Sequence, residues 1–223
     1  MKSLSSLLIA SAVIATASAA SAEVIAGWTM PTAVTATTAA TYRYGAANLG
    51  ALVSGSMLSG THSSASTAWS SPAGNGSTYA LSSNGWNVGD YYQISLATTG
   101  YSGVSVAWDQ TRSGTGPARF EAVWSGSEAL GFGSLGSYTV NQVSWSATVP
   151  VTTSSFASLA SEADDQTSLI IRFKVVIAGA NTTGTNRIDN IVVNGTPIPA
   201  PGAIALIGLA GLVICCASQR CKA

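Results

Sequence analysis

Residues that carry redox, thiol or zinc chemistry are scarce in this chain of 223 residues. Its three cysteines, Cys215, Cys216 and Cys221, lie near the carboxyl end, and His62 is the single histidine. The chain before Cys215 can therefore form no disulfide, offers no thiol nucleophile and lacks the cysteine and histidine clusters that bind Zn²⁺. A domain in this part of the chain must rely on its hydrophobic core for stability.

Charge is scarce as well, because Asp, Glu, Lys and Arg make up only 8% of the residues. Residues 23–195 hold six basic and nine acidic side chains, which gives a net charge of −3, and Lys174 is the one lysine among them. Nucleic-acid binding depends on clustered Lys and Arg side chains. We therefore expect no nucleic-acid partner.

Helical periodicity is also missing from residues 23–195, where short runs of alternating apolar and polar residues are separated by Gly, Ser, Asn and Asp. Such alternation predicts half-buried β-strands. The expected strands cover about residues 24–30, 91–96, 104–108, 119–124, 136–140, 143–149, 169–177 and 187–195. Eight or so strands in one core predict an all-β fold, an antiparallel jelly-roll-like β-sandwich, and the turn-rich link at residues 98–103 suits a hairpin.

The segment from Ser54 to Gly85 is rich in Ser, Gly, Ala and Thr. We interpret it as a long loop region with one short strand near residues 77–81. Long loops in compact domains often carry function, so this region is a candidate binding edge. An ordered surface crossover is the alternative interpretation.

Tryptophan and tyrosine give the domain many flat side chains with polar groups, which can stack on sugar rings. Trp69 and Trp86 are flanked by Ser, Gly and Asn. They are therefore the tryptophans expected to be exposed and to bind a ligand. The alternative is that the tryptophans fill the core, which is the expectation for Trp108 and Trp124.

No catalytic residue is predicted. His62 has no G-x-S-x-G pattern near it and is expected to be a surface or loop histidine. Glycosidases need two carboxylates about 5–10 Å apart, whereas Glu121 has Arg119 and Val123 as its same-face neighbours on an expected strand. The chain is therefore predicted to be non-enzymatic, with a secreted glycoside hydrolase as the contrasting alternative.

Calcium is the metal that the composition still allows, because it binds to oxygen ligands. Asp164, Asp165 and Asp189 are weak candidates for such ligands. The run from Arg187 to Gly195 resembles the last strand of bacterial jelly-roll carbohydrate-binding modules, and that resemblance implies an acidic residue that helps to hold a structural calcium. The alternative is a plain turn and strand in which Asp189 binds local backbone amides. No other cofactor is expected.

Both ends of the chain are hydrophobic. Lys2 is followed by an apolar stretch from Leu7 to Ala15, and Ala20-Ser21-Ala22 before Glu23 fits an A-x-A cleavage site. Residues 1–22 are therefore predicted to be a signal peptide with a hydrophobic helix. The sandwich domain is expected at residues 23–195.

Residues 196–223 combine a Pro-rich hinge, an apolar run from Ala203 to Ala217 and a short basic end. As a helix the run would rise about 22 Å, which is less than the ~30 Å of a bilayer core. Arg220 and Lys222 favour the cytoplasmic side of the membrane. The tail therefore predicts a hydrophobic helix that stays in the membrane transiently, with the domain outside.

This tail resembles the PEP-CTERM sorting signal of Gram-negative bacteria, in which a Pro-Glu-Pro-like motif, a hydrophobic helix and a basic cluster are recognised by an exosortase. Pro199, Ala200, Pro201 and Gly202 stand at the motif, with alanine in place of glutamate, and Arg220 and Lys222 form the basic end.

The resemblance implies a sorting protease of the exosortase type as a partner and a transient stay in the inner membrane. It implies a final location at the cell surface or in the extracellular matrix, and association with extracellular polysaccharide and biofilm. A carbohydrate-binding jelly-roll module is the more specific form of this hypothesis. A retained membrane tail is the alternative to processing.

Overall fold

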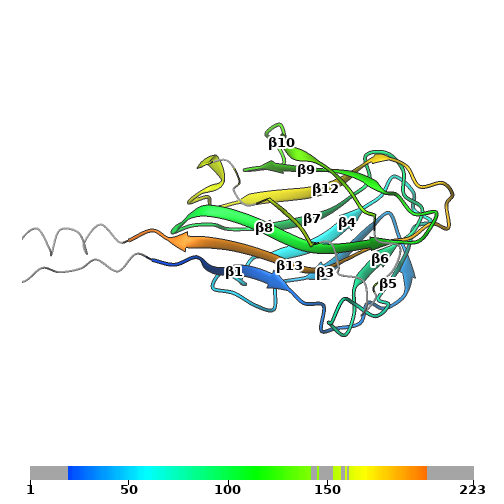
Figure 1. Cartoon of the computed structure of the whole chain (residues 1–223), viewed down its shortest axis with the longest axis horizontal. Coiled ribbons are helices and arrows are strands. Elements are labelled where there is room, and N and C mark those ends of the chain that lie inside the picture. Colours follow the sequence, from blue (N-terminus) through cyan, green and yellow to red (C-terminus); the bar gives the residue numbers. More distant parts are fainter. Residues whose placement is uncertain (1–19, 142–144, 146–152, 157–158, 160, 200–223) are drawn as a thin grey trace, which may run out of the picture. The chain divides into compact units, whose positions relative to one another are not determined.

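The computed structural model describes residues 20–141, 145, 153–156, 159 and 161–199 (Figure 1). Residues 1–19 of the predicted signal peptide, residues 200–223 of the tail and most of the strand expected at 143–149 lie outside the described residues. In the part that the structure describes, no helix is long and apolar enough to cross a bilayer. Residues Ser21–Ile198 form one compact unit.

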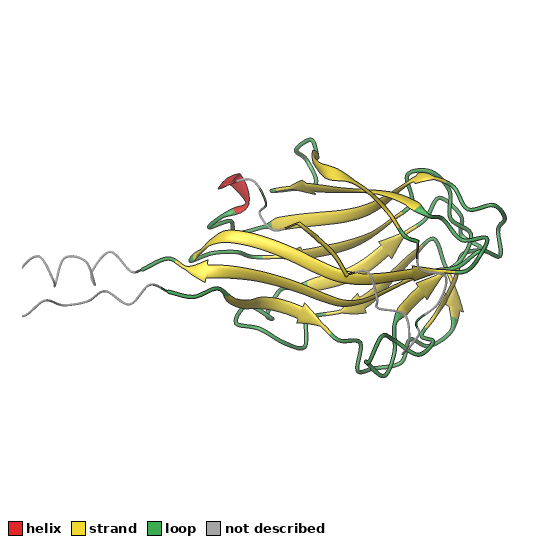
Figure 2. Ribbon diagram, viewed as in Figure 1, coloured by secondary structure: helices red, strands yellow, loops and turns green. Residues whose placement is uncertain are grey.

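The described residues form strands and loops with one short 3₁₀ helix, η1 (Ser161–Ala163), as Figure 2 shows. The strands are β1 (Glu23–Trp28), β2 (Thr37–Thr38), β3 (Thr41–Gly45), β4 (Met57–Thr61), β5 (Ala68–Ser70), β6 (Leu81–Ser83), β7 (Tyr91–Leu96), β8 (Tyr101–Arg112), β9 (Arg119–Ser125), β10 (Gly133–Thr139), β11 (Thr153–Phe156), β12 (Leu169–Ile177) and β13 (Asn186–Pro197). One sheet has the order β11-β8-β13-β6-β5-β2, with β1 also paired to β13, and the other has the order β10-β9-β12-β7-β4-β3.

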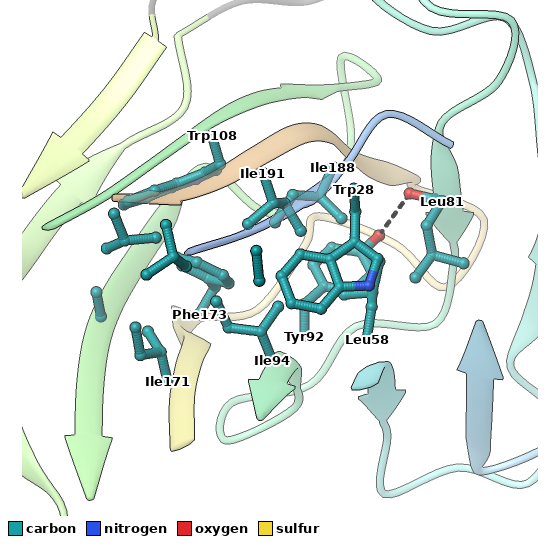
Figure 3. Close-up of a cluster of buried hydrophobic side chains, with 14 of the residues drawn as sticks. Trp28, Leu58, Leu81, Tyr92, Ile94, Trp108, Ile171, Phe173, Ile188 and Ile191 are labelled. Atoms are coloured by element: carbon teal, nitrogen blue, oxygen red, sulfur yellow. Dashed lines mark hydrogen bonds between the residues drawn. The ribbon is translucent and has the colours of Figure 1, made fainter. Parts of the chain in front are cut away.

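Apolar side chains from both sheets meet in one core (Figure 3). The rings of Trp108 on β8 and Phe173 on β12 lie 4.4 Å apart between centroids. The Tyr92 hydroxyl on β7 donates to the backbone oxygens of Leu81 (3.3 Å) and Asn186 (2.8 Å) in the opposite sheet. All recorded strand pairs are antiparallel, so the predicted antiparallel all-β sandwich is confirmed.

The hairpin expected at residues 98–103 is absent from the described structure. Strand β7 pairs with β12 and β4, whereas β8 pairs with β13 and β11 in the other sheet. The link therefore crosses between the sheets. Alternating polarity predicts that two strands exist, but their pairing depends on which neighbours complete each sheet.

The long loop expected from Ser54 to Gly85 is also wrong, because this segment contributes β4, β5 and β6. Several of its small residues are buried, among them Ser56, Thr67, Ser82 and Ser83. Ser83 is 1% exposed, and a Cβ placed on Gly60 would lie 2.3 Å from the Trp69 ring. A strand that packs through Ser and Gly shows little hydrophobic alternation, so its sequence pattern looks like that of a loop.

The last strand, β13, extends into the predicted hinge. Thr196 is in register with Ser102 and Pro197 with Tyr101, and the Ile198 amide donates to the Gly100 oxygen (2.8 Å). The first residues of the Pro-rich segment therefore belong to the sandwich. At the other terminus, Glu23 of β1 is in register with Gly195, so the start of β1 lies beside the end of β13 (Figure 1).

Candidate functional site

The two tryptophans expected to be exposed are buried. Trp69 is 1% exposed and Trp86 is 3% exposed. Their indole N–H groups donate to backbone oxygens, that of Trp69 to Ala39 (2.9 Å) and that of Trp86 to Ser83 (2.9 Å). The expected exposure is wrong because β4, β5 and β6 bring these rings into the core, so neither ring can stack on a ligand. Trp108 is buried as predicted.

His62 is also buried, and it lies between a serine and an aspartate. Its Nε2 atom is 3.1 Å from the Ser83 hydroxyl. Its Nδ1 atom is 3.2 Å from a carboxylate oxygen of Asp90, an approach that is close but poorly aligned for a hydrogen bond. The other side of the ring packs on Trp86, with centroids 4.1 Å apart. His62 lies in the loop after β4, as expected, but it is buried and does not reach the surface. A serine, a histidine and an aspartate in contact are the groups of a catalytic triad, so that chemistry has to be considered.

Access decides against a hydrolase at this position. Ser83 is 1% exposed, and His62 and Asp90 are each 3% exposed, so a substrate carbonyl could not approach the serine. The Ser83 hydroxyl also lies 3.4 Å from that of Tyr92 in the core. We therefore interpret Ser83, His62 and Asp90 as a buried polar network that joins β4, β6 and β7.

The carboxylates proposed for calcium do not converge. Asp164 accepts from the Val104 amide (3.2 Å) and Asp165 from the Gly100 amide (2.7 Å), so both hold the start of β8. Asp189 is in register with Asp109, eight residues beyond Tyr101 on β8, or about 26 Å along the strand. Asp189 lies in register with a second carboxylate, that of Asp109 on the neighbouring strand.

The Asp189 side chain is the centre of a polar cluster. It accepts hydrogen bonds from the backbone amides of Asn75 (2.7 Å) and Asn190 (2.8 Å) and from the Ser77 hydroxyl. Asp109 accepts from the side-chain amides of Asn75 (2.9 Å) and Asn190 (2.8 Å). Burial raises the pKa of Asp189, and the hydrogen bonds to its carboxylate offset part of that effect. The interpretation that Asp189 binds local backbone amides holds for Asn190, whereas Asn75 lies 114 positions away in the chain.

This cluster offers oxygen ligands of the kind that Ca²⁺ prefers: two carboxylates and the Ser77 hydroxyl. Further oxygens would come from the side chains of Asn75 and Asn190, whose NH₂ groups face the carboxylates in this structure. Among the described residues, no group of three His, Cys, Asp or Glu side chains could hold a metal ion. The ligand types fit calcium, and calcium at Asp189 stays a prediction.

The acidic residues on the six-stranded sheet are paired with cations. Glu121 lies 3.2 Å from Lys174, and Glu128 forms an ion pair with Arg172. Hydrogen bonds from Ser134 and Lys174 lower the pKa of Glu121. A general acid of a glycosidase needs a raised pKa, so Glu121 is unsuited to that role.

A pocket of about 390 Å³ opens where β9 turns into β10. Its lining includes Trp124, Leu130, Gly131 and Gly133 from β9, β10 and the loop between them, together with Glu162 and Gln166 from η1 and the loop after it. Trp124 is half-buried, so the prediction that it is a core residue holds only in part.

Gly133 leaves the Trp124 ring accessible. The two residues are in register across β9 and β10, and a Cβ on Gly133 would lie 3.2 Å from the indole Nε1 atom. Glycine therefore keeps the adjoining strand from covering this side of the ring. The Gln166 side-chain amide donates to the backbone oxygen of Asp164 (2.9 Å). This bond fixes the Gln166 side chain and leaves its side-chain carbonyl oxygen as an acceptor. The pocket thus combines an aromatic ring with a carboxylate and an amide.

Arg172 holds the loop that borders this pocket. Its guanidinium lies 4.2 Å from the ring centroids of both Tyr91 and Phe132. It also donates to Gln93 (2.7 Å) and pairs with Glu128. Because Phe132 and Glu128 belong to the β9–β10 loop, these contacts fasten the loop to β12.

Sequence reasoning missed Glu162 and Gln166 because the pocket joins two segments that lie about forty positions apart in the chain. Neither segment carries a motif. The one local signal was Gly133, which follows Phe132 at the start of a strand, and its meaning depends on its register with Trp124.

No protein-family model matches the chain, and no curated protein matches it. Solved structures with some similarity include the CBM22-1 xylan-binding domain from Paenibacillus barcinonensis Xyn10C, with 9% identity and a TM-score of 0.44 over 82% of this chain and 100% of that domain. TmCBM61 in complex with β-1,4-galactotriose has 11% identity and a TM-score of 0.39, over 63% of this chain and 88% of that one. The K3 cleaved adhesin domain of Lys-gingipain from Porphyromonas gingivalis W83 has 13% identity and a TM-score of 0.37, over 55% of this chain and 76% of that domain. At these levels the similarities indicate no function by themselves.

Proposed function

We propose that this chain is an exported, non-enzymatic protein whose sandwich domain binds an extracellular polysaccharide. The observation that carries the proposal is the Trp124 pocket, whose lining combines an accessible indole ring with Glu162 and Gln166. Its volume of about 390 Å³ falls within the ~300–1,000 Å³ of small-molecule pockets.

The polar and apolar groups of the pocket match the chemistry of a sugar ring. The apolar face of a pyranose can stack on an indole, and its hydroxyl groups can donate to the Glu162 carboxylate and the Gln166 carbonyl. Among the described residues, no hydrogen-bond partner is recorded for the Trp124 N–H group, which leaves it able to donate to a sugar oxygen. A weakly charged domain with a single lysine suits a neutral glycan.

The location in this proposal rests on the two ends of the sequence. A signal peptide at residues 1–22 exports the chain, and the tail with Pro199, Ala200, Pro201 and Gly202 is sorted by a protease of the exosortase type. The protein then passes from the inner membrane to the cell surface or the extracellular matrix, where a polysaccharide ligand is present.

Affinity gel electrophoresis tests the binding proposal. The protein is run through gels that contain xylan, β-1,4-galactan, glucomannan or the extracellular polysaccharide of the producing bacterium. We expect retardation in at least one gel. The Trp124→Ala variant should lose affinity about tenfold, which equals about 1.4 kcal/mol, and Glu162→Gln should lose less because one hydrogen bond contributes about 0.5–1.5 kcal/mol.

Glu121→Gln is the matched control for Glu162→Gln, because it removes the same charge from a carboxylate paired with Lys174 outside the pocket. Circular dichroism verifies that each variant is folded. The proposal is wrong if none of the four polysaccharides retards the protein. The site assignment is wrong if folded Trp124→Ala and Glu162→Gln both migrate as the wild type does.

A further inference from the structure

A second pocket, of about 230 Å³, lies at the other edge of the six-stranded sheet. Its lining includes Tyr42 and Tyr44 of β3, Ala46 just after that strand, and Thr32 and Ala33 from the segment after β1. Strand β3 is the edge strand of its sheet, so its flank is not covered by another strand of that sheet.

Hydrogen bonds hold the walls of this pocket in place. The Tyr44 hydroxyl donates to the Thr32 oxygen (3.0 Å) and accepts from the Thr32 amide (3.3 Å). Asn48, which also lines the pocket, accepts from the Thr29 amide (2.9 Å) and donates to the Thr29 hydroxyl (2.8 Å). The pocket is therefore formed before a ligand arrives, which lowers the entropic cost of binding.

Tyr42 supplies both a rigid ring and a free polar group. One face of its ring stacks on the buried Trp69, with centroids 5.6 Å apart and an angle of 26° between the planes. Within the described residues, its hydroxyl has no recorded hydrogen-bond partner, although the side chain is half-buried. A half-buried hydroxyl without a protein partner is available to a ligand that carries hydroxyl groups.

We infer that this second pocket, named here the Tyr42 pocket, binds a neutral sugar unit independently of the Trp124 pocket. The ligand class rests on the proposed function, whereas the pocket itself rests on the contacts of Tyr42, Tyr44 and Asn48. Strands β9 and β3 are four positions apart in the sheet, which corresponds to about 19 Å at ~4.8 Å per strand. One domain therefore holds two glycan segments and links polysaccharide chains to one another.

Two measurements on monomeric full-length protein separate binding from linking. Affinity electrophoresis reports binding at either pocket, and light scattering of a dilute solution of the retarding polysaccharide reports linking, which needs both pockets. The Ala46→Leu variant fills the Tyr42 pocket from an exposed position. We expect it to lose the rise in scattering while its affinity falls only roughly twofold, as one of two sites is lost. The Tyr42→Phe variant, which keeps the stacking on Trp69, should weaken scattering in the same direction.

Thr41→Leu is the control, because it places the same leucine side chain at an exposed position of β3 outside the pocket. It should scatter like the wild type. Wild-type scattering in both folded Ala46→Leu and folded Tyr42→Phe overturns the inference and leaves the Trp124 pocket untouched. If Trp124→Ala binds as the wild type does while Ala46→Leu abolishes retardation, the Tyr42 pocket is the glycan site and the proposed role of Trp124 fails instead.

Discussion

At the residue scale, the buried carboxylate of Asp90 links the stability of the sandwich to pH. Burial alone would raise the pKa of Asp90, but its contact with His62 and hydrogen bonds from the amides of Asn87 and Ser63 outweigh that effect and lower it. The hydrogen bonds from these two amides to the Asp90 carboxylate are both 2.7 Å long. The folded state therefore favours the ionised form of Asp90 more than the unfolded chain does.

The Asp90→Asn variant tests this linkage. Because the folded pKa of Asp90 lies below its unfolded value, which is about 3.9, the stabilisation is present above that value and is lost as the pH falls through the folded pKa. At pH 7 the variant should be less stable by about 1–3 kcal/mol. Thermal melts at several pH values should show a smaller decrease in Tm on acidification for the variant than for the wild type. Parallel curves for the two proteins would contradict this prediction.

At the element scale, the β9–β10 loop depends on contacts with a neighbouring strand. Arg172 of β12 lies between the rings of Tyr91 and Phe132 and pairs with Glu128. Two of these three partners belong to the loop that borders the Trp124 pocket. The shape of the pocket therefore depends on an arginine that is not among its lining residues.

We expect Arg172→Lys to loosen the loop with little effect on the rest of the fold. Lysine keeps the charge but lacks the planar group that stacks on two rings, and cation–π contacts contribute about 0.5–1 kcal/mol at exposed sites. Hydrogen exchange should accelerate at residues 126–132, and polysaccharide affinity should fall a few-fold, roughly 1 kcal/mol or less. Arg119→Lys is the control, because Arg119 is exposed at the start of β9. Unchanged exchange in the loop would exclude this role for Arg172.

At the scale of the whole molecule, the start of the first strand, β1, lies beside the end of the last strand, β13. Glu23 is in register with Gly195, and the Tyr101 hydroxyl donates to the Glu23 carboxylate (2.6 Å). Tyr101 is also in register with Pro197. Removal of the predicted signal peptide after Ala22 would leave β1 complete, and the proposed cleavage of the tail would have to fall beyond β13 to leave the domain complete.

Intact-mass analysis of the protein from the native cell surface or medium checks both ends. We expect a chain that begins at Glu23 and ends no earlier than Ile198, because β13 extends to Pro197 and the Ile198 amide is bonded to Gly100. Alkylation of cysteine is the control, since all three cysteines lie beyond residue 214. A mass that includes Cys215, Cys216 and Cys221, with three alkyl groups added, would show a retained tail.

The sequence predicted strands well where alternation is strong. The runs at residues 91–96, 119–124 and 169–177 correspond to β7, β9 and β12, because an apolar side chain at every second position is a local property of a strand with one buried face. The strands within the segment from Ser54 to Gly85 were not predicted, because Ser83 and Gly60 face the core. Burial of such small residues produces no hydrophobic alternation in the sequence.

The sequence by itself determined an all-β domain without disulfides, with little charge and with hydrophobic segments at both ends. The tertiary structure decided which side chains reach solvent. Trp69 and Trp86 became core residues because β4–β6 complete the two sheets around them, and Trp124 became accessible because Gly133 faces it in register. Exposure depends on contacts between strands far apart in the chain, and local alternation carries no information about those contacts.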